Sequence, residues 1–186
     1  MTRRYLIGFI IAAGLIVLLI FLIFGGGKPT VPSTQQSLDS YSSSNSEVSM
    51  TIDGPINADQ NHEQVKVIVS ATSATFEQIQ GYQGNVAHTQ SYPNNVNAYT
   101  NFLFALEGVN FTKGNSDPKM ADERGYCPLG TRYIFELDNN GSTLERFWTT
   151  DCGGTHTYGG ITNATIQLFE NQIPDYSKLT TGLTNL

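Results

Sequence analysis

Positive charge is scarce in this sequence. Its 186 residues include 10 lysines and arginines against 16 aspartates and glutamates. Setting aside Arg3, Arg4 and Lys28 near the N-terminus leaves 7 basic against 16 acidic residues, a formal charge of −9. A surface of that sign repels phosphate backbones and anionic lipid headgroups. The composition therefore argues against nucleic-acid binding.

Catalytic motifs are also missing. The chain contains no Gly-x-Ser-x-Gly segment, which excludes the nucleophile elbow of the α/β-hydrolases. The paired glycines Gly153-Gly154 and Gly159-Gly160 lack the lysine and the helix-opening context of a phosphate-binding loop. We expect no bound cofactor and no resident metal, and the sequence does not indicate an enzyme.

Cysteine is limited to one pair, Cys127 and Cys152. A lone pair outside the cytoplasm usually forms a disulfide. Asn140-Gly141 predicts a hairpin turn between them, since this dipeptide favours the left-handed backbone of such turns. Cys127 lies 13 residues before the turn and Cys152 lies 11 after it, so the two arms bring them together. We predict a structural disulfide at the open end of this hairpin.

A long apolar run, Tyr5–Phe24, is the strongest positive signal in the sequence. Its 20 residues carry no charge, enough for a helix to cross the ~30 Å hydrocarbon core of a bilayer. It is longer than the apolar core of a signal peptide and no Ala-x-Ala cleavage site follows, so we expect it to remain as an anchor. Arg3 and Arg4 place the N-terminus in the cytoplasm. We expect a single-pass membrane protein with residues 1–4 as a cytoplasmic tip, residues 5–24 as the transmembrane helix and the rest outside the cytoplasm.

Beyond the anchor we expect a stalk and one domain. Residues 25–46 are rich in Gly, Pro, Ser, Thr and Gln and predict a disordered stalk. Residues 47–186 predict an α+β domain, a small antiparallel sheet with two helices packed on one face. We expect two strands, a helix near residues 95–106 that Gly108 ends, the hairpin, and a helix near residues 162–171. Residues 71–93 show no clear pattern, and we expect the last dozen residues to be loose.

Several stretches resemble short surface proteins of the reduced-genome candidate phyla bacteria, Saccharibacteria among them. These stretches are YPNNVNAYTNFLFALEGVNFTKGN, CPLGTRYIFEL, FWTTDCGGTHTYGG and LFENQIPDY, which cover about the last half of the chain. The resemblance implies a bacterial cell-surface setting and paired cysteines. It implies no activity.

Two other function classes are open. A sortase-like cysteine transpeptidase would use His88 and Cys152, but those enzymes also need an arginine after the cysteine, and none follows Cys152. A pilin-like assembly subunit would be built on the apolar N-terminal helix, but no glutamate lies early in that run. A zinc site could use Cys127, Cys152 and His156, with His88 or Asp151 as the fourth ligand. The paired spacings of known zinc modules are absent.

An aromatic cluster surrounds the predicted hairpin and the second cysteine. Phe147, Trp148 and Tyr158 are either core residues or a candidate aromatic binding patch for a peptide or glycan. We therefore expect a non-enzymatic, membrane-tethered domain with binding or envelope-structural duty. Its partners would be the lipid bilayer, through the N-terminal helix, and a protein or glycan ligand outside the cell.

Overall fold

The computed structural model describes residues 37–43, 45–183 and 186. Within these ranges, no helix is both long enough and apolar enough to cross a membrane. The predicted anchor, Tyr5–Phe24, and most of the predicted stalk lie outside them. The described residues belong to one compact unit that extends from Gln36 to Leu186.

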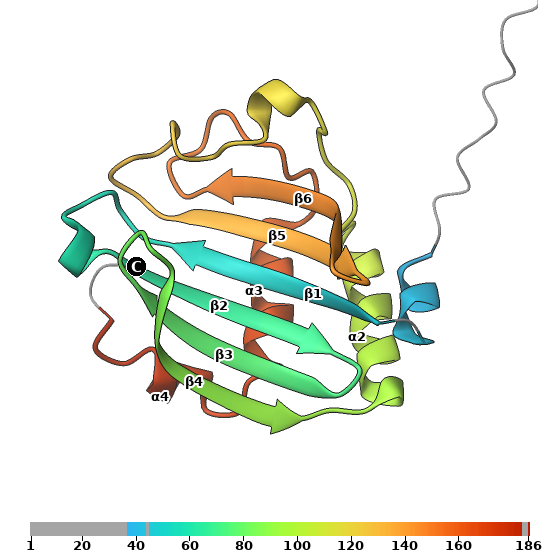
Figure 1. Ribbon diagram of the computed structural model, residues 1–186. Helices are drawn as coiled ribbons and strands as arrows, with labels where there is room; N and C mark the ends of the chain where they lie inside the picture. The colour runs from blue at the N-terminus through green and yellow to red at the C-terminus, as the bar shows by residue number, and fades with distance from the viewer. Residues whose placement is uncertain (1–36, 44, 184–185) are drawn as a thin grey trace, which may run out of the picture. The chain divides into compact units, whose positions relative to one another are not determined.

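Six strands form a single antiparallel sheet (Figure 1). Across the sheet their order is β4-β3-β2-β1-β5-β6. The first strand of the sequence therefore lies inside the sheet, between β2 and β5, and the edges are β4 and β6. The strands are β1 (Ser46–Asp53), β2 (Glu63–Ser70), β3 (Ser73–Gln80), β4 (Asn85–Pro93), β5 (Arg132–Asn139) and β6 (Ser142–Thr150).

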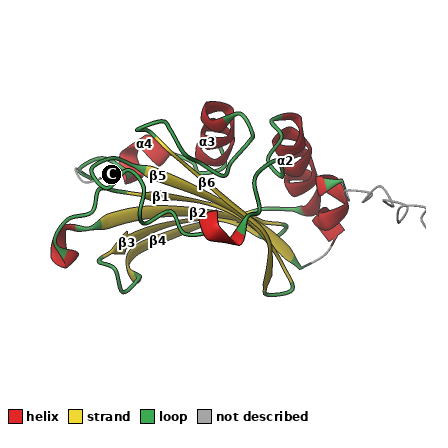
Figure 2. Cartoon of the chain, turned by 90° about the horizontal axis from the view of Figure 1, so that it is seen from above, coloured by secondary structure: helices red, strands yellow, loops and turns green. Residues whose placement is uncertain are grey.

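Helices cover one face of this sheet. Figure 2 shows α2 (Val96–Gly108), α3 (Thr162–Glu170) and α4 (Tyr176–Leu179) on the same side. Three short 3-10 helices are η1 (Leu38–Ser43), η2 (Asp59–Asn61) and η3 (Pro118–Met120). The predicted α+β class, an antiparallel sheet with helices on one face, is confirmed.

The core lies between the sheet and the helices. Strand register aligns Met50 with Val67 on one side and with Phe135 on the other, so alternate residues of each strand share the covered face. The alternation visible in the sequence of β1 and β2 is therefore the core pattern. Fully buried members from the sheet and the helices are Val48, Met50, Val65, Val67, Val69, Phe76, Tyr99, Leu103, Leu106 and Phe169.

The folded unit begins before residue 47, the predicted boundary. Leu38, in η1, is only 2 % exposed and belongs to the core. Two hydrogen bonds join this segment to α2: Ser37 Oγ to Glu107 at 2.8 Å, and Ser46 Oγ with the Tyr99 hydroxyl at 3.1 Å. The prediction of disorder up to residue 46 is therefore wrong for residues 37–43, because apolar Leu38 anchors them.

Two further segments differ from expectation. Residues 71–93, which showed no pattern, form β3 and β4, so the sheet has six strands where four were expected. In β4 every residue except Tyr92 is exposed, which leaves no apolar alternation to recognise. The last dozen residues, expected to be loose, include α4, whose Tyr176 packs edge-on against Phe76 with ring centroids 6.0 Å apart.

Local signals at one helix start and one turn are confirmed. Asn95 caps α2, since its side-chain oxygen accepts from Ala98 N at 3.0 Å. Asn140 and Gly141 have φ values of 52° and 76°, the left-handed conformations that a two-residue hairpin turn requires. These residues join β5 to β6 as predicted.

The prediction that Gly108 stops α2 is wrong. Gly108 is the last helical residue, and Asn110, at φ 60°, takes the left-handed position instead. Phe111 N donates to Leu106 O at 3.0 Å, and Asn110 N donates to Glu107 O at 2.9 Å. This is a Schellman motif, which asparagine can close almost as glycine does. The buried Phe111 side chain fixes the position of the stop.

Candidate functional site

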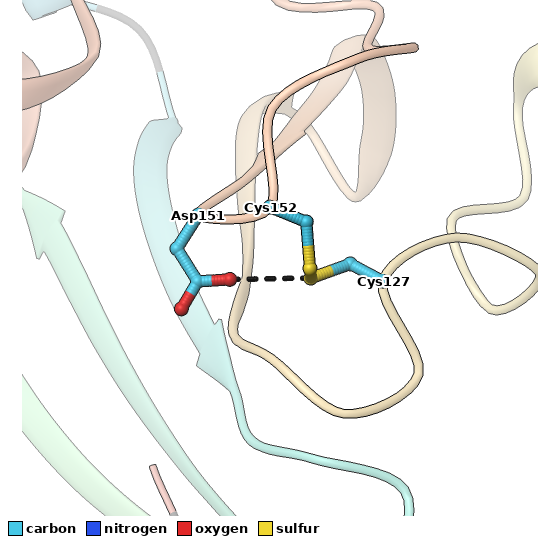
Figure 3. Close-up of side chains that lie close together, drawn as sticks. All are labelled: Cys127, Asp151 and Cys152. Atoms are coloured by element: carbon cyan, nitrogen blue, oxygen red, sulfur yellow. Dashed lines mark hydrogen bonds between the residues drawn. A yellow bond between two sulfur atoms is a disulfide. The ribbon is translucent and has the colours of Figure 1, made fainter.

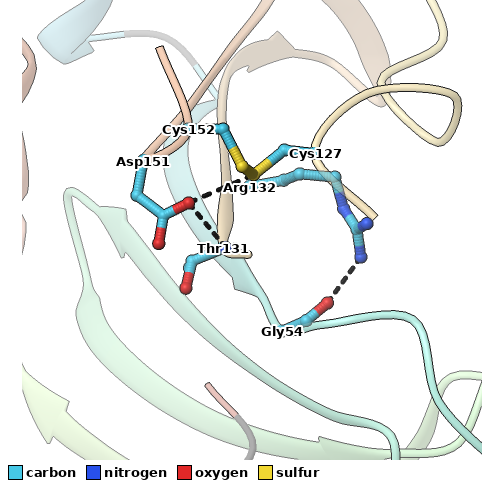
Figure 4. Close-up of a disulfide and its surroundings, with 6 residues drawn as sticks. All are labelled: Gly54, Cys127, Thr131, Arg132, Asp151 and Cys152. Carbon is cyan, nitrogen blue, oxygen red and sulfur yellow. Dashed lines mark hydrogen bonds between the residues drawn. A yellow bond between two sulfur atoms is a disulfide. The ribbon is translucent and has the colours of Figure 1, made fainter. Parts of the chain in front are cut away.

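The two cysteines are bonded to each other. Cys127 and Cys152 form a disulfide with Cα atoms 5.8 Å apart and a sequence separation of 25, so the predicted pairing is confirmed (Figure 3). The Asp151 carboxylate lies 3.1 Å from Cys127 Sγ, a contact without a proton to share, because a disulfide sulfur carries none. The same carboxylate oxygen accepts from Thr131 N at 3.0 Å (Figure 4).

The structure does not give Cys152 the free thiol and the nearby histidine that a cysteine nucleophile needs. Both thiols are consumed by the disulfide, and nucleophilic attack requires a free thiolate. His88 lies on β4 and Cys152 follows β6, at opposite edges of the sheet. Five strand spacings of ~4.8 Å put them roughly 24 Å apart. The sortase-like arrangement of histidine and cysteine is therefore contradicted.

The same bond bears on the metal hypothesis. Cys127, Asp151 and Cys152 bring ligand-type atoms within 4.8 Å of one another. The two sulfurs are nevertheless bonded to each other, so they do not offer thiolates to zinc. His156, the third predicted ligand, is exposed, and its Nδ1 lies 2.8 Å from Gly154 O. This geometry is that of a disulfide beside an unrelated loop histidine.

The three residues of the candidate aromatic patch are buried. Phe147, Trp148 and Tyr158 have exposed fractions of 3 %, 0 % and 2 %. Trp148 lies on the face opposite α2 and α3, where its Nε1 donates to Met120 O at 2.7 Å and the centroid of its ring lies 4.7 Å from that of Tyr126. The segment between α2 and β5 therefore covers it. Burial of this degree leaves these three rings without surface for a ligand, so the core interpretation describes them.

A buried polar network joins the ends of three strands. Arg132 Nε donates to Asp53 Oδ2 at 2.8 Å, and the other carboxylate oxygen lies 2.9 Å from both His62 Nε2 and Gln64 Nε2. Arg132 also donates to the carbonyl of Gly54 (Figure 4). Arg132 and His62 are each 1 % exposed and Asp53 is 6 % exposed. We call Asp53, His62, Gln64 and Arg132 the Asp53 network.

The Asp53 network has the properties of a structural clamp. It ties the end of β1 to the start of β2 and the start of β5, and each charge has an opposite or hydrogen-bonding partner. The His62 ring stacks on Tyr82 at a centroid distance of 4.0 Å, which adds the β3–β4 turn. Sequence reasoning missed this network, because its central pair, Asp53 and Arg132, is 79 residues apart and neither residue belongs to a local motif.

A second group of titratable residues lies near α3 and α4. Burial is the main cause that raises the pKa of the Tyr176 hydroxyl, and the charge of Glu170 adds to it. Burial likewise raises the pKa of Tyr133 and of the Glu170 carboxyl. A phenol whose pKa is raised is a weaker proton donor at neutral pH.

Charge is absent from one long segment of this acidic chain. From Gln78 to Leu106 the sequence contains no Asp, Glu, Lys or Arg. This segment supplies β4 and most of α2, and we call its surface the uncharged edge. The segment also carries four large apolar side chains that are about half exposed or more: Tyr82 at 47 %, Val86 at 50 %, Val96 at 50 % and Phe104 at 71 %.

The two edge strands, β6 and β4, differ in their backbone hydrogen bonds to the rest of the chain. Along β6, Trp148 O accepts from Thr157 N at 3.0 Å and Tyr158 N at 2.9 Å, while Trp148 N donates to Thr157 Oγ1. Along β4, within the part of the chain that the structure describes, no backbone hydrogen bond arrives from outside the sheet. An edge of this kind presents backbone donors and acceptors that an added strand can pair with.

Comparison with known proteins adds no relative. No protein-family model matches the chain, and no curated protein matches it. The structure presents a disulfide-bonded domain whose sheet has an exposed, uncharged edge strand. The lack of charge between Gln78 and Leu106 was the signal in the sequence that could have marked this edge.

Proposed function

We propose that this chain is a membrane-tethered extracytoplasmic module that binds an extended polypeptide segment along β4. The observation that carries the proposal is the uncharged, exposed edge strand of an otherwise acidic domain. Strand addition supplies main-chain hydrogen bonds at such an edge, and the side chains that alternate along the strand set the specificity. A protein ligand is favoured over a glycan, because an exposed edge strand offers backbone donors and acceptors that pair with an extended polypeptide.

Membrane placement rests on sequence and on the disulfide. The apolar run Tyr5–Phe24 supplies the anchor, and Arg3 and Arg4 favour a cytoplasmic N-terminus. A disulfide persists in oxidising compartments, which suits a domain outside the cytoplasm.

Cysteine labelling in intact cells tests this placement. A membrane-impermeant thiol reagent is expected to label Ser37→Cys, which lies at the start of the domain, without permeabilisation. The matched variant Thr2→Cys is expected to react only after permeabilisation. Labelling of Thr2→Cys in intact cells, with Ser37→Cys protected, would reverse the orientation.

Hydrogen exchange tests binding at β4. In the full-length chain, the backbone amides of residues 85–92 are expected to exchange about tenfold more slowly in the membranes of producing cells than in dilute detergent. Such a factor matches about 1.4 kcal/mol of added edge pairing. Thr89→Lys is expected to remove the difference, because a lysine on an edge strand opposes strand addition. Leu144→Lys, on β6, is the matched control and should keep the difference.

Buried β2 provides the internal standard of this measurement. Its amides are paired on both sides, so they should exchange at the same rate in both preparations. Equal exchange of β4 in membranes and in detergent would refute binding at this edge. Slower exchange of β2 and β4 together would instead indicate a general change of stability.

A further inference from the structure

We infer that the strand which pairs with β4 is β4 of a second copy of this chain. The inference rests on the proposed function, since it names the partner at the same edge. Most soluble oligomers are symmetric, and a two-fold axis places the same surface on both sides of the contact. A strand added to its own copy across such an axis runs antiparallel, which is the pairing used throughout this sheet.

Charge favours a second copy over another partner. The domain beyond Lys28 carries a formal charge of −9, so two copies repel each other at most surfaces. The uncharged edge is where copies can meet without placing carboxylates opposite carboxylates. A different polypeptide attracted to this domain would be basic and would gain more from its acidic surfaces than from an edge without charge.

Irregularities at the two ends of β4 define the length of the pairing segment. The register pairs Gln78 with His88 but Ile79 with Val86, so Ala87 is an extra residue, a β-bulge. At the other end Pro93 has no N–H to donate. The regular edge therefore runs from His88 to Tyr92, and its middle residue is Gln90.

This segment is complementary to itself. Centred on Gln90, an antiparallel pair places His88 opposite Tyr92 of the second copy and Thr89 opposite Ser91. Threonine and serine hydroxyls commonly hydrogen-bond across strands, and aromatic rings opposite each other stabilise a pair. The chain already contains one such contact, between Thr75 Oγ1 and Ser91 Oγ at 3.0 Å. The paired strands would join two sheets into one.

The opposite edge does not offer the same contact. On β6 the backbone of Trp148 is bonded to the segment at Thr157 and Tyr158, and the strand carries Glu145 and Arg146. Tethering to one membrane further assists pairing at β4, because it raises the effective concentration of the copies. A short strand contact of moderate intrinsic affinity is then enough.

Cross-linking of the full-length chain in membranes tests the inference. Two Gln90→Cys residues would face each other across the two-fold axis with Cα atoms ~5 Å apart, within the reach of a disulfide. Under mild oxidation we expect about tenfold more linked dimer from Gln90→Cys than from Leu144→Cys, the matched variant on the exposed part of β6. Adding Thr89→Lys to Gln90→Cys should abolish the dimer.

Correct folding is checked before oxidation by counting thiols in the denatured, unreduced protein. One reactive thiol shows that the native disulfide has formed. Three reactive thiols in Gln90→Cys would show that the native disulfide has not formed. In that case the oligomeric mass of the unmodified chain is measured in detergent at high concentration and compared with that of Thr89→Lys. A monomeric mass for both proteins contradicts the inference.

The two experiments distinguish pairing between copies from binding of another polypeptide at β4. Equal cross-linking of Gln90→Cys and Leu144→Cys, or none in either, overturns pairing between copies. If β4 amides remain protected in membranes in that case, another polypeptide occupies the edge and the proposed function stands. If that protection is also absent, both proposals fall.

Discussion

Replacing Arg132 with alanine is expected to lower the free energy of unfolding by about 3–5 kcal/mol, the usual cost of removing one member of a buried ion pair. The guanidinium is 1 % exposed and donates to Asp53 Oδ2 at 2.8 Å. Its loss leaves the Asp53 carboxylate buried with weaker compensation, and it also leaves the Gly54 carbonyl without its donor.

The measurement is urea unfolding of the full-length chain in detergent, followed by the fluorescence of Trp148. This is the single tryptophan of the chain and is fully buried, so its emission reports on the domain. Arg124→Ala is the matched control: Arg124 pairs with Asp122 on the surface and is 78 % exposed at its side chain, and its removal should change little. Equal effects of the two alanine variants would show that the Asp53 network does not stabilise the fold.

A double-mutant cycle identifies the partner of Arg132. Asp53→Asn and Arg132→Ala should each destabilise, and the double variant should cost less than their sum, by about 0.5–3 kcal/mol. Additive effects would mean that Arg132 stabilises the fold through contacts other than the Asp53 carboxylate, such as the Gly54 carbonyl and packing. The shortfall measures the coupling between β1 and β5 at this end of the sheet.

Removing the disulfide with Cys127→Ser and Cys152→Ser together is expected to cost about 3 kcal/mol, because the bond closes a 25-residue separation and limits the unfolded chain. The bond also holds the segment that covers Trp148, since Tyr126 next to Cys127 packs on the indole ring. The double variant should therefore show a more solvent-exposed tryptophan as well as a lower unfolding midpoint.

Reduction of the unmodified chain provides the comparison for this variant. The reduced protein and the double-serine variant should unfold at the same urea concentration, since both lack the cross-link. An unchanged midpoint in the variant, or two alkylatable thiols in the unreduced denatured protein, would contradict a stabilising disulfide and restore the nucleophile and metal hypotheses.

The sequence predicts those parts of the fold that depend on short-range patterns. Val48 and Met50 alternate along a strand that is covered on one face, Asn140-Gly141 demands a turn, and the cysteines lie at matching distances from that turn. Each of these signals is short-range, so the sequence alone could predict β1, the hairpin and the disulfide.

The remaining parts depended on contacts that no local pattern contains. Strand β4 is exposed along nearly its whole length, so it shows neither an apolar stripe nor an alternation. Gly108 looked like a helix stop, but the burial of Phe111 moved the stop to Asn110. Arg132 and Asp53 meet only after β5 has paired with β1. Candidate binding residues were predicted among the aromatics, where size suggested a ligand surface and packing instead placed them inside.

The position of β1 inside the sheet has a consequence for synthesis of the chain. Strands β1 to β4 follow one another and can pair as a meander as soon as they are made, whereas the Asp53–Arg132 pair waits for 79 further residues. At ~5–20 residues per second, roughly 4–16 s pass between the two. Throughout that interval the side of β1 that later receives β5 is an unpaired strand edge, the kind of surface that nascent chains aggregate through. A holding factor, or attachment to the membrane at the N-terminal end, would matter most during those seconds.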